Sequence, residues 1–382
     1  MNLTEILHQL KKEGNYRYLP DDFSKEKYVD FSSNDYLGLG NDTTLRKKFL
    51  DTLIDNLPSF SSSASRLLSA SQDEHAQLEE VLSHAYNRDV LLFNSGYHAN
   101  TGTIGAMASI GRTLILADRL AHASIIDGII LSRAPFLRFP HNDMNTLERL
   151  ILRNRDKYDH IIIITESIFS MDGDSAPLND FIELKKRYPK IVLYLDEAHA
   201  FGVLGPHGLG LAASFPNAEL WDVVIGTFGK AAASAGAFVS TSKEIKEFLI
   251  NKARSLIFST ALPPFQSKWT TFVFRKMLTM DHERVHLQVL GEKLNKVIKK
   301  YAYEPYLPAT SHIQPLVIGD AKLALNISSE LERKGIKALP IRRPTVPPGT
   351  ERIRFSLSSA MAEKEIERLE QALFESDAAN IR

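Results

Sequence analysis

A lysine follows directly after an apolar run in the middle of the chain. The stretch "VVIGTFGK" ends at Lys230, and small residues, "AAASAGAF", come next. Buried lysines are rare unless they are paired, and burial of a lysine favours the neutral amine. An amine in such a place can act as a nucleophile that forms a Schiff base with a carbonyl compound. A lysine at a strand end whose amine extends to solvent explains the pattern equally well.

An acid and a histidine lie three residues apart at the end of another apolar run. The stretch "LYLDEAHAFG" places Asp196 at the end of this run and His199 shortly after it. A carboxylate there could hold a protonated heteroaromatic nitrogen, and the imidazole could contact a neighbouring phenolate. A local hydrogen bond or a capping arrangement explains the same pair. A metal site is a third option, but no second cluster of acid and imidazole ligands occurs nearby, so no metal is expected.

Two further turns come after apolar runs and before helical segments. In "FNSGYHAN", Gly96 opens a helix whose N-terminus could offer free N–H groups and a positive dipole end to a phosphate. A plain turn also explains a single glycine, and neither the Walker pattern nor the dinucleotide fingerprint is present. In "ADRLAHASIIDG", His122 stands at a helix start, where it could cap the helix or lie flat on an aromatic ring.

A fifth stretch, "TESIFSMDGDSAPL", follows an isoleucine-rich run and contains Ser170, Asp172 and Asp174. Its acids do not have the spacing of an EF-hand calcium loop. A polar crossover loop explains the stretch, and the hydroxyl of Ser170 could also contribute to a site formed by neighbouring strand ends.

These residues require a sheet that brings several strand ends together. Strands are predicted at residues 90–93, 112–117, 160–165, 191–196 and 222–227. Helices are predicted at residues 71–86, from 96 onward, at 122–132 and at 178–187, the first of them opened by a capping box, "SQDE", at Ser71 to Glu74. Uninterrupted Ile, Val and Leu runs between helices indicate a mostly parallel sheet covered on both faces. Ligands bind outside the carboxyl ends of such strands, where the five stretches are expected to meet.

The two ends of the chain are expected to belong to a smaller α/β part. Residues 2–12 have the pattern of a short amphipathic helix, and residues 243–300 are helical with few breaks. Strands are predicted in "SHIQPLVIG" and "ERIRFSL", with helices at 321–334 and at the C-terminal end. We therefore expect an N-terminal segment, 1–45, that packs on a small domain, 281–382, and a large cofactor-binding domain, 46–280.

Composition limits the classes of function. The 382 residues include 46 basic and 46 acidic side chains, so no basic excess favours nucleic acid or a membrane surface as a partner. Disulfides, thiolate catalysis and cysteine-ligated metals are excluded because the chain has no cysteine. The N-terminus lacks the apolar stretch of a signal peptide, and the apolar runs are far shorter than the roughly 20 residues that a spanning helix needs. These features predict a cytoplasmic protein.

Together, the five stretches meet the needs of one cofactor, pyridoxal 5′-phosphate. Its aldehyde needs an amine, its ring nitrogen a carboxylate, its phosphate a helix N-terminus, and its ring face a planar partner. A dinucleotide dehydrogenase on a similar sheet would need the glycine fingerprint that is absent here.

The motifs resemble those of the α-oxoamine synthases, a family of fold-type I pyridoxal-phosphate enzymes. The resemblance runs from "FSSNDYLGLG" (31–40) through "ADRLAHAS", "FSMDGDSAPL", "DEAHAFGVLGPHGLG" and "TFGKAAASAGAF" to "RRPTVPPGTERIRFSLSSA". It covers nearly the whole chain. "IQPLVIGD" and "IRRPTVPPGT" favour the branch that condenses L-alanine with a pimeloyl thioester, carried on coenzyme A or on a carrier protein. A sister synthase that uses glycine with acetyl or succinyl groups is the nearest alternative.

The resemblance implies catalytic roles for matched residues. Lys230 would form the Schiff base, and Asp196 would hold the pyridinium nitrogen. His199 would contact the ring O3′, and His122 would stack on the ring and assist as an acid. Ser170 would contact the cofactor. Because these residues are present together, a non-catalytic partner subunit of the same family is disfavoured.

The resemblance also implies binding residues and a homodimer with shared active sites. Further cofactor contacts would come from the backbone of Gly96 and Tyr97 and from Thr227. A second subunit would contribute phosphate contacts from Ser259 and Thr260. Substrate contacts would come from Arg17, Asn34, Arg342 and Thr345, with Arg342 holding the carboxylate of alanine.

Overall fold

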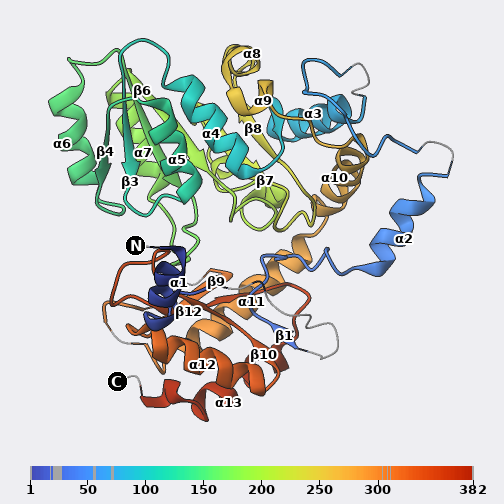
Figure 1. Cartoon of the computed structure of the whole chain (residues 1–382). Coiled ribbons are helices and arrows are strands. Elements are labelled where there is room, and N and C mark those ends of the chain that lie inside the picture. The colour runs from blue at the N-terminus through green and yellow to red at the C-terminus, as the bar shows by residue number, and fades with distance from the viewer. Residues whose placement is uncertain are drawn as a thin grey trace. The chain divides into compact units, whose positions relative to one another are not determined.

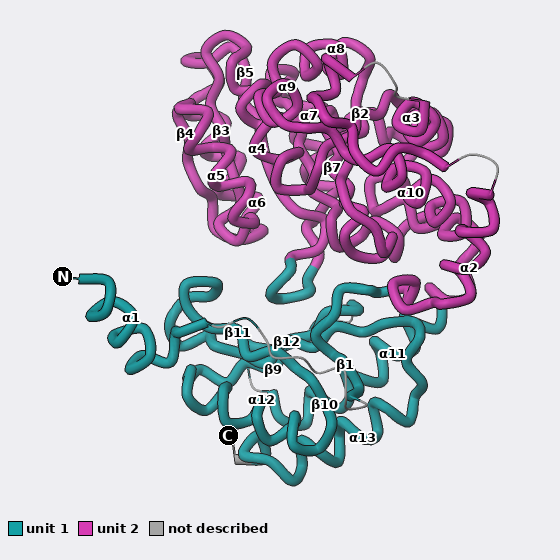
Figure 2. Tube along the Cα trace, turned by 45° about the vertical axis from the view of Figure 1, so that its right-hand side comes forward, with its two compact units in different colours: residues 1–36, 170–174, 285–382 teal, residues 37–169, 175–284 magenta. Residues whose placement is uncertain are grey.

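Runs rich in Ile, Val and Leu form the main sheet in the computed structural model. The structure describes residues 2–17, 19, 28–54, 57–69, 73–302, 304–307, 309 and 311–380. The chain divides into two compact units (Figure 2). Unit 1 comprises residues 1–36, 170–174 and 285–382, and unit 2 comprises residues 37–169 and 175–284. The division into domains at 1–45, 46–280 and 281–382 stays a prediction.

The sheet of unit 2, several strands of which are labelled in Figure 1, has seven strands among the described residues, in the order β2-β8-β7-β6-β5-β3-β4. Its strands are β2 (Asp89–Phe93), β3 (Thr113–Asp118), β4 (Phe136–Phe139), β5 (His160–Glu166), β6 (Ile191–Asp196), β7 (Val223–Thr227) and β8 (Ala237–Thr241). Only β8 runs antiparallel to its neighbours, β2 and β7. The remaining pairs are parallel. The mostly parallel sheet is thus confirmed.

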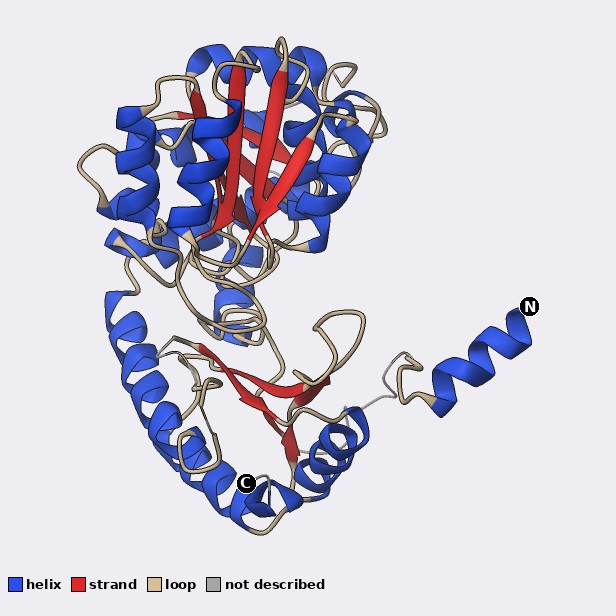
Figure 3. Cartoon of the chain, turned by 90° about the vertical axis from the view of Figure 1, so that its left-hand side faces the viewer, coloured by secondary structure: helices blue, strands red, loops and turns tan. Residues whose placement is uncertain are grey.

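Helices cover both faces of this sheet (Figure 3). The apolar cluster on one face includes side chains of α4 (Gly96–Met107), α5 (Ala123–Ser132), α8 (Lys243–Lys252) and α9 (Arg254–Ile257). The cluster on the other face includes side chains of α6 (Met144–Asn154) and α7 (Leu178–Arg187). The strands are buried on both sides, which explains why their sequences are continuously apolar rather than alternating.

The other helices of unit 2 are α2 (Thr43–Asp51), α3 (Asp73–Tyr86) and α10 (Pro264–Met277), with short 3-10 turns at Pro206–Gly208, Ala212–Ser214 and Ala218–Leu220. The next helix, α11 (Asp281–Ile298), continues from unit 2 into unit 1. The predicted helix 71–86 corresponds to α3, and Ser71 of the predicted capping box lies outside the described residues.

Unit 1 contains a three-stranded antiparallel sheet in the order β11-β12-β9 and a two-stranded parallel pair, β1-β10. Its strands are β1 (Val29–Asp30), β9 (Ile313–Val317), β10 (Ile336–Lys337), β11 (Leu339–Ile341) and β12 (Arg352–Ser356). Its helices are α1 (Leu3–Lys12), α12 (Ala321–Arg333) and α13 (Glu363–Phe374), with a 3-10 turn at Asp377–Asn380.

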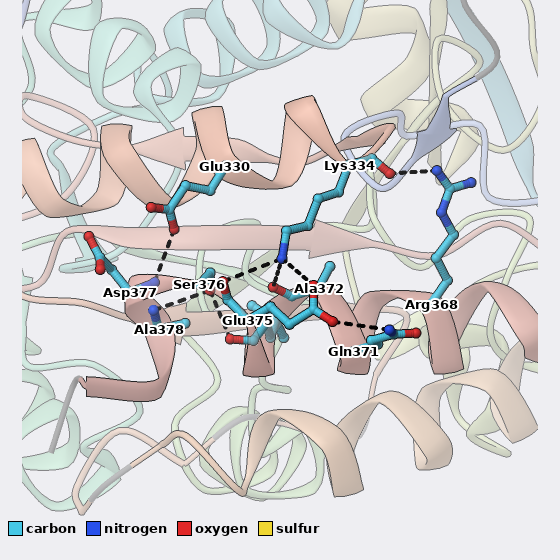
Figure 4. A network of polar contacts seen from close by, with 10 residues as sticks. Glu330, Lys334, Arg368, Gln371, Ala372, Glu375, Ser376, Asp377 and Ala378 are labelled. Carbon is cyan, nitrogen blue, oxygen red and sulfur yellow. Dashed lines mark hydrogen bonds and ion pairs between the residues drawn. The ribbon is translucent and has the colours of Figure 1, made fainter.

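Polar contacts join the ends of α12 and α13 (Figure 4). Lys334 Nζ donates to Glu375 Oε2 at 2.8 Å, and Glu330 Oε2 accepts from the backbone N–H of Asp377 at 3.0 Å. Arg368 donates to the backbone oxygen of Lys334. These partly exposed contacts fix the last turn of the chain against α12.

Four elements of unit 2 are absent from the sequence prediction: α2, β4, α6 and β8. The β4 strand is a short edge strand in which three of four residues are exposed, so it lacks the apolar run of a central strand. In contrast, α6 has a readable signal, since Asp143 caps it and Leu147 and Ile151 lie one turn apart on its buried face. None of the helices within the described residues combines the length and hydropathy needed to cross a membrane.

Candidate active site

Lys230 lies three residues beyond the end of β7. The apolar pattern predicts a buried side chain, but Lys230 is only half-buried, between the exposed Gly229 and the buried Ala231. Its Nζ lies 2.9 Å from Nε2 of His199, which is buried. The structure therefore brings together the lysine and the histidine that the sequence analysis takes from two different strand ends.

Asp196 ends β6 and is buried, with 5% of its surface exposed. Its Oδ2 accepts from Nδ2 of Asn100 at 2.8 Å, and its Oδ1 accepts from the backbone N–H of Ala198 at 2.8 Å. Asn100 comes from α4 and also accepts from the hydroxyl of Tyr194 at 2.7 Å. The carboxyl group is thus held in one orientation by two N–H donors.

His122 caps the N-terminus of α5. Its Nδ1 lies 2.8 Å from Oγ of Ser124 and 3.2 Å from the backbone nitrogen of the same residue. Burial lowers the pKa of His122, and the charge of Lys230 lowers it further while Asp196 opposes both. The residue still has exposed surface, so a planar group could lie on its ring. Capping and ring stacking, the two alternatives from the sequence, are therefore compatible.

A second acid, Glu166, lies at the end of β5 and is not among the residues that the sequence predicts. The strand register pairs Glu166 with Asp196. Its Oε1 accepts from the backbone N–H of His122 at 2.6 Å. Burial raises the pKa of Glu166 well above its usual value, and the charge of Asp196 raises it further. The signal in the sequence is an acid as the last residue of a buried isoleucine run, "HIIIITE".

The N-terminus of α4 meets the end of β7. A Cβ added to Gly96 would lie 3.7 Å from the Cβ of Thr227, and the hydroxyl of Ser95 accepts from the backbone N–H of His98. Tyr97 points its hydroxyl to the carboxylate of Asp127, and 46% of its surface is exposed. Of the predicted phosphate contacts, Gly96 and Thr227 therefore lie together, and Tyr97 could contribute its backbone.

Ser259 and Thr260 lie next to this helix start in the same chain. Nδ2 of Asn94 donates to Oγ of Ser259 at 3.1 Å and to the backbone oxygen of Thr260. Their predicted contribution to the site of a second subunit stays a prediction.

In unit 1, Asn34 and Ser170 meet at a residue that the sequence analysis overlooks, Arg354. The guanidinium of Arg354 donates from Nε to the backbone oxygen of Ser170 at 2.6 Å and from Nη2 to Oδ1 of Asn34 at 3.1 Å. Arg354 is buried, with 5% of its surface exposed. Tyr36 is also close, and burial raises the pKa of its hydroxyl to about 12 although Arg354 opposes this rise.

The signal for Arg354 is the alternation of arginines in "RIRFS", because alternate residues of a strand share one face. The neighbouring arginine, Arg352, forms an ion pair with Asp172 and donates to the backbone oxygen of Met171 at 3.2 Å. Both arginines of β12 thus hold the segment 170–174.

The remaining predicted substrate residues form a separate set of contacts in the described part of unit 1. Nη2 of Arg17 donates to Oγ1 of Thr345 at 3.0 Å. Nη1 of Arg342 donates to the backbone oxygen of Gly14. Both arginines therefore tie the segment after α1 to the turn after β11. Within the described residues, no three acid or histidine side chains are grouped as a metal site requires.

The chain belongs to the aminotransferase class I and II family, whose model matches residues 26–373. It is 45% identical over 371 residues to the "Putative 8-amino-7-oxononanoate synthase" of Pasteurella multocida, and this match covers 95% of both chains. It is also 44% identical over 376 residues to the protein of the same name from Neisseria meningitidis. The latter match covers 96% of this chain and 98% of its relative.

Solved structures of two enzymes are similar to this chain. The 8-amino-7-oxononanoate synthase of Francisella tularensis has a TM-score of 0.75 at 30% identity, covering 91% of this chain and 96% of that one. The structure of SPT with a PLP internal aldimine has a TM-score of 0.85 at 26% identity, covering 92% and 88%. These likenesses confirm the predicted family resemblance and the predicted fold class. The chain is therefore an enzyme of the class to which the 8-amino-7-oxononanoate synthases belong.

Proposed function

We propose that the protein uses pyridoxal 5′-phosphate to condense L-alanine with a pimeloyl thioester. The products would be 8-amino-7-oxononanoate, CO2 and free coenzyme A or carrier protein, which is a step of biotin biosynthesis. The observation that carries this proposal is the grouping of Lys230, His199, Asp196 and His122 at the carboxyl ends of β6 and β7 and the start of α5. The relatives named for this activity support it along 95% of the chain.

The residues present fit the cofactor. A half-buried amine at Lys230 could hold it covalently, and the buried carboxyl of Asp196 suits a protonated ring nitrogen. His122 offers a ring with exposed surface, and the free N–H groups at the start of α4, beside Thr227, suit a phosphate. When bound, pyridoxal phosphate supplies an electron sink that stabilises negative charge on the substrate carbon beside the amino group.

Two side chains of unit 2 could move protons in the reaction. The amine of Lys230 would accept the proton from Cα of alanine, and His199, 2.9 Å from it, would orient the amine. His122 would assist as an acid at the thioester carbonyl.

Each of the two substrates carries one free carboxylate, and two arginines of the chain are candidates to bind them. Arg342 is the residue that the sequence predicts for alanine. Arg354 is a second candidate, because it is buried and its Nε and Nη2 contact neutral oxygen atoms of Ser170 and Asn34. A buried guanidinium is stabilised when an anion binds it through paired hydrogen bonds. We assign the alanine carboxylate to Arg354 and the pimeloyl carboxylate to Arg342, with Arg17 and Thr345 beside it.

A substrate screen tests this function. The purified protein with pyridoxal phosphate is incubated with alanine, glycine or serine and with pimeloyl, acetyl, succinyl or palmitoyl thioesters, and the amino ketone products are measured. We expect alanine with a pimeloyl thioester to give the highest kcat/KM. Glycine with acetyl or succinyl thioesters as the best pair would instead identify a sister synthase. Serine with palmitoyl thioester as the best pair would also overturn the proposal.

A further inference from the structure

We propose that Asn100 and Ser124 fix His122 as the neutral tautomer that carries its proton on Nε2. This inference rests on the proposed function, because it assigns the two residues as positioning residues for the histidine that would cover the cofactor ring. The assignment follows from a chain of hydrogen bonds that begins at Asp196.

The first link determines how the amide of Asn100 is turned. Asn100 is buried with 2% of its surface exposed, and its amide lies between Asp196 and Tyr194. A carboxylate only accepts hydrogen bonds, so the NH2 group of the amide must face Asp196. The amide oxygen then accepts from the hydroxyl of Tyr194, whose pKa is raised well above its usual value by burial, so this hydroxyl keeps its proton.

The second link determines the direction of the Ser124 hydroxyl. The same Nδ2 of Asn100 lies 2.9 Å from Oγ of Ser124, which is buried with 1% of its surface exposed. An amide NH2 has two hydrogens and accepts nothing, so Ser124 accepts here. Its own hydrogen is left to point to Nδ1 of His122, 2.8 Å away.

The third link determines the tautomer of the imidazole. Nδ1 of His122 also lies 3.2 Å from the backbone nitrogen of Ser124, which can only donate. A ring nitrogen that accepts from two donors carries no hydrogen of its own, so the proton of the neutral ring is on Nε2. The side chain therefore presents Nε2–H as a donor. The same network joins α4, α5 and β6, so the carboxyl of Asp196 and the ring of His122 are positioned together.

The charged groups around His122 agree with a neutral ring. Lys230 lowers its pKa, as burial does, and Asp196 raises it. Glu166 accepts from the backbone N–H of His122, and burial raises the pKa of Glu166 well above its usual value, which favours its neutral form.

Nitrogen-15 NMR of the cofactor-free, full-length protein tests the tautomer directly. The protein is labelled in its histidine side chains, and the His122 signals are assigned by their loss in His122→Gln. In the wild type we expect a protonated Nε2 and an unprotonated Nδ1 near neutral pH. Ser124→Ala removes the hydroxyl donor, so we expect His122 to titrate at higher pH and its tautomer signature to shift toward a protonated Nδ1.

Ser132→Ala is the matched control, because it removes a hydroxyl from the same helix whose described contacts are all local: it donates to the backbone oxygen of Ile129 and accepts from the backbone N–H of Ala134. We expect this control to leave the His122 signals unchanged. In the product assay, Ser124→Ala should lower kcat by between about two-fold and ten-fold, the effect of one lost hydrogen bond. Its pH profile should change along with the titration of His122.

Two results would overturn the inference. One is a wild-type His122 protonated on Nδ1, a measurement that needs no variant and so does not depend on the folding of one. The other is a Ser124→Ala protein whose His122 signals match those of the wild type. If instead no substrate pair yields product while the wild type carries its proton on Nε2, the proposed function fails and the tautomer assignment stands.

Discussion

At the residue scale, two acids on neighbouring strands have different hydrogen-bond partners. Asp196 accepts from the side-chain amide of Asn100 and the backbone of Ala198, whereas Glu166 accepts a single hydrogen bond from the backbone of His122. Burial and the charge of Asp196 raise the pKa of Glu166 well above its usual value. The raised pKa favours the protonated form of Glu166, which reduces the negative charge that would otherwise lie close to Asp196.

This difference predicts how stability depends on pH. Between the ordinary pKa of a glutamate, about 4.3, and the raised pKa of Glu166 in the folded state, the unfolded chain has lost this proton and the folded chain retains it. The folded state then binds more protons, so this residue makes the free energy of unfolding decrease as pH rises. Glu166→Gln removes the effect and keeps an oxygen that can accept from His122. We expect the Tm of Glu166→Gln, relative to the wild type, to increase from pH 5 to pH 8.

The same measurement on Glu166→Ala separates charge from contact. This variant also loses the titration but leaves the backbone N–H of His122 without its acceptor, so it should be less stable than Glu166→Gln at every pH. A Tm difference between Glu166→Gln and the wild type that does not change with pH would contradict a raised pKa.

The second prediction at this scale concerns Lys230. Its amine lies 2.9 Å from His199, and the proposed function requires it to hold the cofactor. Reduction of the loaded protein with borohydride and peptide mapping should leave the pyridoxyl group on Lys230. Lys230→Ala should lose this label, and activity should fall by a factor of about a hundred or more, as expected for a lost acid–base group. Lys243→Ala, in α8 of the same unit, is the control and should retain both. A label on any other lysine would contradict the assignment.

At the scale of elements, the apolar runs predict β5, β6 and β7 almost to the residue, because strands buried on both faces need continuous apolar side chains. The partners of polar residues are harder to predict. Glu166 gains its role from being paired in register with Asp196, and Asn100 from α4 packing over β6. Both depend on contacts between residues far apart in the chain, and local pattern carries no information on these.

The strand β12 shows the same limit and leads to a third prediction. Its alternation indicates that Arg352 and Arg354 share one face, but only the fold shows that Arg354 meets Asn34 and Ser170. A lysine cannot form the paired hydrogen bonds of a guanidinium to a carboxylate. Arg354→Lys should therefore raise KM for alanine by about ten-fold or more, equivalent to about 1.4 kcal/mol or more, and leave KM for the pimeloyl thioester nearly unchanged.

Arg342→Lys is the matched comparison, because Arg342 is the residue that the sequence predicts for the alanine carboxylate. We expect it to raise KM for the pimeloyl thioester and not for alanine. If Arg342→Lys raises KM for alanine and Arg354→Lys does not, Arg342 binds the alanine carboxylate. Arg354 would then have a structural role in holding the segment 170–174.

At the scale of the whole molecule, the family resemblance could be predicted from motifs spread over nearly the entire chain, and the family match to residues 26–373 bears this out. The assembly is a different matter, since one chain with equal numbers of basic and acidic residues gives no charge pattern that indicates a partner. The homodimer, and the contribution of Ser259 and Thr260 to a neighbouring site, therefore need an experiment that detects shared sites.

Mixing two variants, each chosen to impair activity on its own, provides that experiment. Lys230→Ala removes the amine from its own site, and Thr260→Ala removes a hydroxyl that is predicted to serve the site of the other subunit. If each site combines Lys230 of one subunit with Thr260 of the other, a mixed dimer has one site with both defects and one intact site. Random exchange of subunits makes half of the dimers mixed, so about a quarter of wild-type activity should return.

Two controls should stay inactive. One is each variant kept apart, and the other is a mixture of Lys230→Ala with His199→Ala, because Lys230 and His199 contact each other within one chain. If light scattering shows dimers but neither mixture recovers activity, each chain builds its site alone. The contacts from Asn94 to Ser259 and Thr260 within one chain would then explain that result.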